Sequence, residues 1–125
     1  QPVLSSWQAL LDYLRADMAH KTTERVRVLH LNSKNMLVRD EIMSEGSIDQ
    51  AAVHPREVIR RAIELGSAAI ILVHNHPSGD PAPSRADIQL TRDIAEAGKK
   101  LGISVHDHII IGAEGHSSMR SLGLL

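Results

Sequence analysis

The sequence predicts an α/β domain in which a mixed sheet lies between helical layers. Segments with helical periodicity alternate along the chain with short strand-like segments, which is typical of a sheet packed against helices. Residues 68–74 are almost entirely apolar and rich in Ile and Val, so we expect them to form the central strand. The 125 residues fit a single domain, residues 1–125, that buries about two-thirds of its unfolded surface.

Each half of the chain supplies part of this pattern. The first half predicts a helix at 4–19, capped by Ser5 or Ser6, and then a hairpin of strands at 25–31 and 36–43. The helix is indicated by apolar residues at helical spacing: Leu4, Trp7, Leu10, Leu11, Leu14 and Met18.

The second half predicts a helix at 55–65 that begins at a proline, a helix at 85–101, a strand at 104–111 and a short strand at 116–119. The inward residues expected of the first of these helices are Val58, Ile59, Ala62, Ile63 and Leu65. Those expected of the second are Ile88, Leu90, Ile94, Ala97 and Leu101.

Composition narrows the classes of function. The chain carries 14 basic and 15 acidic residues, so it lacks the basic excess of electrostatic nucleic-acid binders. It has one Trp, one Tyr and no Phe, which leaves few rings for base stacking. No cysteine is present, so disulfides and thiolate metal sites are excluded and a reducing cytoplasm is the expected location. No apolar run approaches the roughly 20 residues of a membrane span.

Two histidines, His74 and His76, stand at the end of the predicted central strand. Residues two apart on a strand face the same side with Cα atoms about 6.5 Å apart, so both imidazoles can reach one ion at about 2.0–2.1 Å. Asp87, at the start of the following helix, would add a carboxylate. Two histidines and a carboxylate with one open position form the ligand set of a hydrolytic zinc site.

The same residues also have a purely structural interpretation. Ser84 and Asp87 have the spacing of a helix capping box, and a His-x-His pair on a strand is often structural or solvated. Capping and ligation are compatible, because one oxygen of Asp87 can hold the helix start while the other binds metal. All these residues meet where a strand ends and a helix begins, a position at which sites collect in α/β folds, and this favours the metal site.

Two further groups of residues are open to interpretation. His106 and His108 alternate with Asp107 on a predicted strand, so we expect both on one face, either as ligands or partners of a metal site or as hydrogen-bonded core histidines; the second role is favoured. Hydrolysis also needs a proton acceptor near the attacking water. The acidic candidates are Glu24, Glu41, Glu45 and Glu57, and spacing does not choose among them.

The spacing His74-x-His76-Pro77 followed by Ser84-x-x-Asp87 resembles the signature of the JAMM metalloproteases, which are built on JAB/MPN domains. Segments HNHPSGDP, VHPRE and DHIIIG are similar to the RadC branch in particular, and the resemblance extends from about Glu24 to the C-terminus. It implies a three-layer α/β/α fold like that of cytidine deaminase. It also implies that a helix-hairpin-helix-like domain precedes this region in the longer protein and is absent from this chain.

The resemblance further implies an activity, the hydrolysis of peptide or isopeptide amides with one Zn2+ per chain held by His74, His76 and Asp87. The base of JAMM domains stands at the start of the first strand after the first helix, which corresponds here to Glu24. This residue would take a proton from water and return it to the leaving amine. Ser84 would cap its helix and steady the water or the tetrahedral oxyanion.

Two other functions compete with hydrolysis. RadC-like proteins are linked by name to DNA repair, which suggests a module associated with nucleic acid, but the charge and the scarcity of aromatic rings disfavour it. Some MPN relatives are non-catalytic domains that bind partners, but they characteristically lose ligands that this chain retains. A zinc nucleobase deaminase would need cysteine ligands and is excluded.

Overall fold

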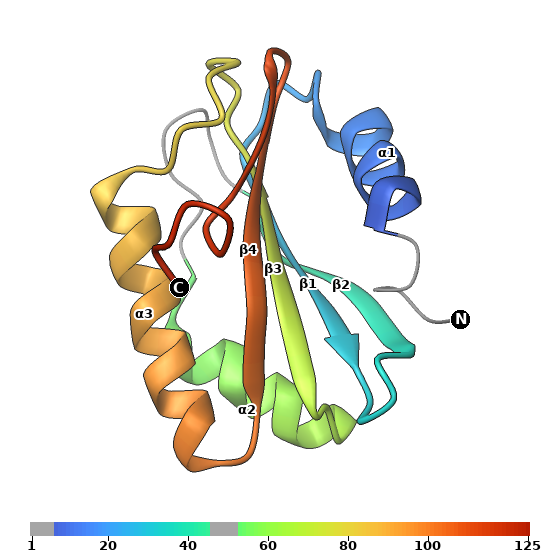
Figure 1. Cartoon of the computed structure of the whole chain (residues 1–125), viewed down its shortest axis with the longest axis vertical. Helices are drawn as coiled ribbons and strands as arrows, with labels where there is room; N and C mark the ends of the chain where they lie inside the picture. The colour runs from blue at the N-terminus through green and yellow to red at the C-terminus, as the bar shows by residue number, and fades with distance from the viewer. Residues whose placement is uncertain (1–6, 46–52) are drawn as a thin grey trace.

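The computed structural model describes residues 7–45 and 53–125 (Figure 1). Its elements follow in the order α1 (Trp7–Met18), β1 (Arg25–Leu31), β2 (Leu37–Glu45), α2 (Pro55–Leu65), β3 (Ala69–Asn75), α3 (Arg85–Lys100), β4 (Ser104–Gly112) and β5 (Gly115–Ser118). The strands form one sheet in the order β2-β1-β3-β4-β5. Only the β3–β4 pair is parallel, so the predicted α/β fold with a mixed sheet is confirmed.

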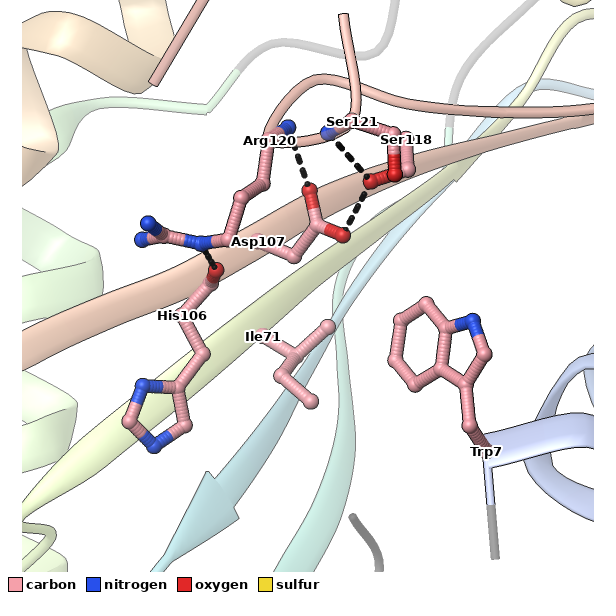
Figure 2. A pocket seen from close by; sticks show the side chains of 7 residues that line it. All are labelled: Trp7, Ile71, His106, Asp107, Ser118, Arg120 and Ser121. Carbon is pink, nitrogen blue, oxygen red and sulfur yellow. Dashed lines mark hydrogen bonds between the residues drawn. The ribbon is translucent and has the colours of Figure 1, made fainter. Parts of the chain in front are cut away.

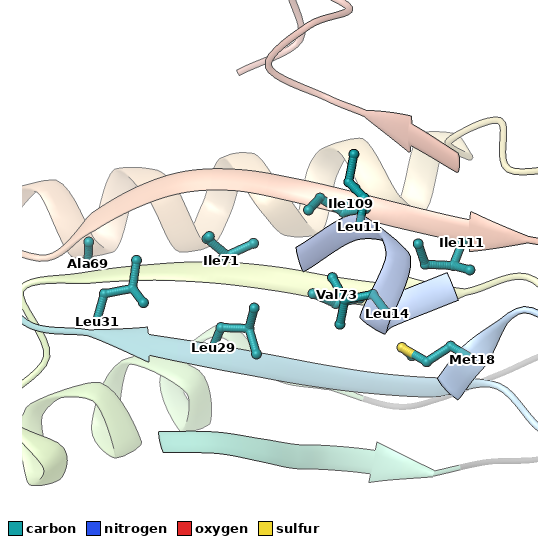
Figure 3. Packing of buried hydrophobic residues seen from close by; sticks show 10 residues of the cluster. All are labelled: Leu11, Leu14, Met18, Leu29, Leu31, Ala69, Ile71, Val73, Ile109 and Ile111. Carbon is teal, nitrogen blue, oxygen red and sulfur yellow. The ribbon is translucent and has the colours of Figure 1, made fainter. Parts of the chain in front are cut away.

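Helices cover both faces of this sheet. Figure 1 shows α1 on one side of the strands and α2 and α3 on the other. Between α1 and the sheet lies an aliphatic cluster, drawn in Figure 3, to which both contribute: Leu11, Leu14, Met18, Leu29, Leu31, Ala69, Ile71, Val73, Ile109 and Ile111. Beneath α2 and α3 lies a second cluster of Val28, Val58, Ile59, Ala62, Ile70, Leu72, Ile94, Ile103 and Val105. Alternate residues of β1 and β3 therefore contribute to opposite cores.

Strand β3 lies between β1 and β4, and all seven of its residues are buried, as expected of a central strand. Helix α3 carries the chain from the end of β3 back to the start of the parallel strand β4. The carboxyl end of β3 and the first turn of α3 are thus adjacent, which is where α/β folds gather functional side chains.

Most element boundaries agree with the sequence to within two residues. Strand β2 runs on to Glu45 rather than ending at residue 43, and β5 spans Gly115–Ser118 rather than residues 116–119. The predicted start of the first helix, with Ser5 or Ser6 as its cap, lies outside the described residues. No helix within the described ranges is long and apolar enough to cross a bilayer.

The prediction of a buried position is wrong for two residues. Ile63 and Leu101 are each 56% exposed. Ile63 is not among the buried residues of α2, and Leu101 follows the end of α3 at Lys100. The buried residues of α3 are instead Asp87, Thr91, Ile94 and Gly98. This spacing still follows one face of a helix, but the face is partly polar, so hydrophobic periodicity alone does not reveal it.

Candidate metal centre

The end of β3 and the start of α3 bring together the three residues that the sequence singles out. Asp87 Oδ1 lies 3.3 Å from His74 Nδ1, and Asp87 Oδ2 lies 3.0 Å from His76 Nε2. The two imidazole rings meet edge to face, with centroids 4.8 Å apart. Each of the three side chains offers a ligand atom, and these atoms lie within 4.8 Å of one another, so the group could hold a metal ion.

Asp87 performs the capping role at the same time. Its backbone N–H donates to Ser84 Oγ at 3.0 Å, and its Oδ2 accepts from the Ser84 N–H at 2.8 Å. Both bonds of a capping box are therefore present. The structural and functional interpretations of this pair coexist, because the cap fixes the carboxylate at the point where the histidines converge.

The loop after β3 is docked against the end of β4. The N–H of His76 donates to Ile111 O at 2.8 Å, and the N–H of Glu114 donates to Gly79 O at 3.2 Å. Gly112 allows this close approach, since a Cβ added there would lie 2.1 Å from Gly79 O. Gly79 itself has a φ of +97°, which favours glycine. These contacts fix His76 relative to the sheet.

Glu24 reaches the cluster from the start of β1. Its Oε1 contacts His74 Nε2, and its side chain is largely buried. Asn75, between the two histidines, holds the flanking backbone: its Oδ1 accepts from the Arg25 N–H at 2.7 Å and its Nδ2 donates to Thr23 O at 3.0 Å. Glu24 therefore projects from a segment that is pinned on both sides.

The other acidic candidates lie elsewhere. Glu41 accepts from the Arg61 side chain at 2.8 Å, Glu45 pairs with Arg25, and Glu57 stands in the first turn of α2. Of the four, Glu24 is the one that the structure places against a histidine of the cluster.

The contact between His76 and Asp87 shifts the pKa values of both side chains. The hydrogen bond to Asp87 raises the pKa of His76 and outweighs the opposing effect of burial. Burial disfavours ionisation of Asp87, but hydrogen bonds from His76 and Ser84 and the nearby His74 together hold the pKa of Asp87 well below its usual range. A cation bound here would compete with protonation of His76, because a metal ligand must offer a free lone pair.

His108 lies beside the cluster and is in contact with α3. Its Nδ1 is 2.5 Å from Thr91 Oγ1, and its ring centroid is 5.8 Å from that of His74. Burial, reinforced by the charge on His74, lowers the pKa of His108 to about 3. The prediction of a hydrogen-bonded core histidine fits this residue.

His106 does not share a face with His108, so that expectation is wrong. The β3–β4 register passes from the pair Ile70–Val105 to the pair Ile71–Asp107, which leaves His106 as the extra residue of a bulge. The Nε2 atom of His106 lies 2.9 Å from Asn35 Oδ1. This contact is far from the metal cluster in the fold.

Asp107 has an architectural role, which Figure 2 shows. Its Oδ1 accepts from the Arg120 N–H at 3.0 Å and its Oδ2 accepts from Ser118 Oγ, so it holds the C-terminal turn against β4. These residues line a cavity of about 410 Å³ that Trp7 and Ile71 border on the side of α1. None of the residues of the metal cluster lines this cavity.

Sequence reasoning missed two residues that support the cluster. Thr91 follows Asp87 by one helical turn, so their spacing alone would have placed it on the same face. Asn75 separates the two histidines, and strand alternation would have directed it to the opposite side of β3. Neither is apolar or a metal ligand, so neither was singled out.

Fold and cluster together define an α/β domain with a candidate metal centre made of two histidines and one carboxylate. The chain matches the family model of the RadC-like JAB domain over residues 4–124 and belongs to that family. This agrees with the resemblance indicated by the segments HNHPSGDP, VHPRE and DHIIIG.

Proposed function

We propose that this domain is a zinc-dependent hydrolase that cleaves peptide or isopeptide amide bonds. The observation that carries the proposal is the convergence of His74, His76 and Asp87 with a fourth group, Glu24, in contact with one of the histidines. A set of two nitrogens and one oxygen fits zinc and leaves a coordination position for water or substrate. Membership of the RadC-like JAB family supports the same assignment.

The residues of this chain divide the chemistry among them. A zinc ion, when bound, supplies a Lewis acid that polarises the carbonyl and lowers the pKa of water toward about 7. The carboxylate of Glu24 then accepts the proton of the attacking water and delivers it to the amine nitrogen as the C–N bond breaks. Asn75 keeps Glu24 in place by holding the backbone on both sides of it.

Ser84 has a hydrogen available for the reaction. Its Oγ accepts from the Asp87 N–H, so the capping role uses a lone pair and leaves the hydroxyl hydrogen free to donate. The residue is exposed at the helix start, three positions before Asp87. A hydroxyl aimed at the oxygen that gains charge would stabilise the tetrahedral stage of amide hydrolysis.

Replacement of Glu24 by Gln tests this proposal. The substitution keeps the size of the side chain and one accepting oxygen but removes the base, so zinc content should stay unchanged while turnover falls about 100- to 10,000-fold. Fluorogenic peptides and isopeptide-linked peptides provide the substrates. Glu45→Gln, which makes the same change at the exposed end of β2, is the matched control and should retain activity.

Two results would overturn the proposal. One is full activity in the zinc-loaded Glu24→Gln variant, which would remove Glu24 from the reaction. The other is a zinc-loaded, folded chain that cleaves no amide of either class.

A further inference from the structure

A buried hydrogen-bond chain connects the backbone of Asp87 to strand β4. The hydroxyl of Thr91 donates to the carbonyl oxygen of Asp87 at 2.8 Å, and Nδ1 of His108 lies 2.5 Å from the same hydroxyl oxygen. Thr91 and His108 are each 1% exposed. The proposed function uses neither residue.

The direction of each hydrogen bond follows from the number of hydrogens. A carbonyl carries none, so the single hydroxyl hydrogen of Thr91 must point to Asp87. Thr91 Oγ1 is then an acceptor, and Nδ1 of the neutral His108 must carry the hydrogen that it receives. Nε2 of His108 is left as a bare lone pair, and it has no hydrogen-bond partner among residues 7–45 and 53–125.

This unpaired nitrogen argues that His108 does more than fill space. A buried polar atom without a partner destabilises the fold, and an apolar ring of similar size would remove that cost. What an apolar ring cannot do is donate to Thr91. The feature that distinguishes His108 from a packing residue is therefore its link to the main chain of Asp87.

The chain joins the two elements that carry the cluster. His108 is paired with Leu72 in the β3–β4 register, two residues before His74 on the same face of β3. Asp87 is consequently held from two sides, by Ser84 at its N–H and carboxylate and by Thr91 at its carbonyl. Sliding of the first turn of α3 along the sheet would break this link.

We propose that Thr91 and His108 are positioning residues that fix Asp87 relative to His74 and His76, and that they thereby set the affinity of the domain for zinc. The inference rests on the metal site of the proposed function, but not on the hydrolytic reaction. Residues that orient metal ligands typically change metal affinity 10- to 100-fold when they are replaced.

The test is the zinc dissociation constant of the whole chain, measured by competition with a chromophoric chelator at fixed pH. Thr91→Val keeps the shape of the side chain but removes the hydroxyl, and it should weaken zinc binding about 10- to 100-fold. Thr91→Ser keeps the hydroxyl and is the matched control, with affinity close to that of the unsubstituted chain. His108→Phe removes the other end of the link and should also weaken zinc binding. It provides the test if Thr91→Val does not fold.

A structural role and a positioning role give different results. The urea midpoint of each metal-free variant reports general stability, whereas zinc affinity reports the placement of Asp87. If the two residues act through one link, the double variant should bind zinc little more weakly than the single variant with the larger loss of affinity. Unchanged zinc affinity in folded Thr91→Val and His108→Phe would overturn this inference and leave the proposed function intact. An unsubstituted chain that binds no zinc would overturn both.

Discussion

Acid should destabilise the metal-free domain through His108, and replacement of this residue by Phe should remove that part of the pH dependence. Burial lowers the pKa of His108 to about 3, from 6.5 for an exposed histidine. Between these two values the unfolded chain binds a proton at this residue and the folded chain does not. His108 therefore causes no pH-dependent loss of stability above about pH 6.5, and it lowers the unfolding free energy progressively as the pH falls toward 3.

The magnitude follows from this shift. Each pH unit below the pKa of the unfolded state removes about 1.4 kcal/mol of unfolding free energy. His108 alone should thus lower the unfolding free energy of the metal-free domain by about 2 kcal/mol at pH 5 relative to pH 7. Small domains have total stabilities of about 5–15 kcal/mol, so a loss of this size is readily measured.

The assay is urea unfolding with a chelator present, at pH 7 and pH 5, for the unsubstituted chain, His108→Phe and Thr91→Val. The Phe variant should lose about 2 kcal/mol less on acidification than the unsubstituted chain. Thr91→Val breaks the hydrogen bond but leaves the imidazole buried, so it should keep the full pH dependence. Equal losses in the unsubstituted chain and in His108→Phe would refute the assignment of a buried, neutral imidazole.

Three further outcomes are expected. Ser84→Ala removes the acceptor that caps α3 and should lower the unfolding free energy of the metal-free chain by about 1 kcal/mol in urea titrations; no change would mean that the capping box contributes nothing to stability. Gly112→Ala places a Cβ 2.1 Å from Gly79 O, so it should displace the loop that carries His76 and weaken zinc binding in chelator competition; wild-type affinity would show that the loop adapts freely. Asp87→Asn removes the main cause of the raised pKa of His76, so that pKa should fall in an NMR titration of the metal-free chain, and an unchanged value would contradict the pairing of these two side chains.

The fold and the ligand cluster could be predicted largely from sequence because their signals are local. The apolar run of β3 ends at the histidine pair, and the loop and cap that bring Asp87 to it lie within the next eleven residues. Strand alternation and capping chemistry act over such short distances. A short segment of sequence was therefore sufficient to place all three side chains near one another.

Glu24 shows where local reasoning ends. It lies 50 residues from His74 in the sequence, and their contact depends on the antiparallel register that pairs Val26 with His74. Alternation within a strand shows on which face each residue lies, but not which residue of a distant strand lies opposite it. Only the family resemblance distinguished Glu24 from the other acidic candidates.

The β-bulge at His106 and the polar face of α3 were missed for related reasons. Alternation along β4 does not show that one of its own residues is left out of the pairing with β3, so His106 and His108 were expected on one face. On α3, the buried face includes Asp87 and Thr91 because it is directed toward a polar site. Hydrophobic periodicity assumes an apolar environment and therefore cannot identify such a face.

The most direct test of the account is the zinc content of the purified chain after zinc loading and removal of free metal, measured by elemental mass spectrometry. The unsubstituted chain should retain about one zinc, and His74→Ala, His76→Ala and Asp87→Ala should each lose it while remaining folded. Retention of zinc by all three variants, or its absence from the unsubstituted chain, would contradict a metal centre at the end of β3.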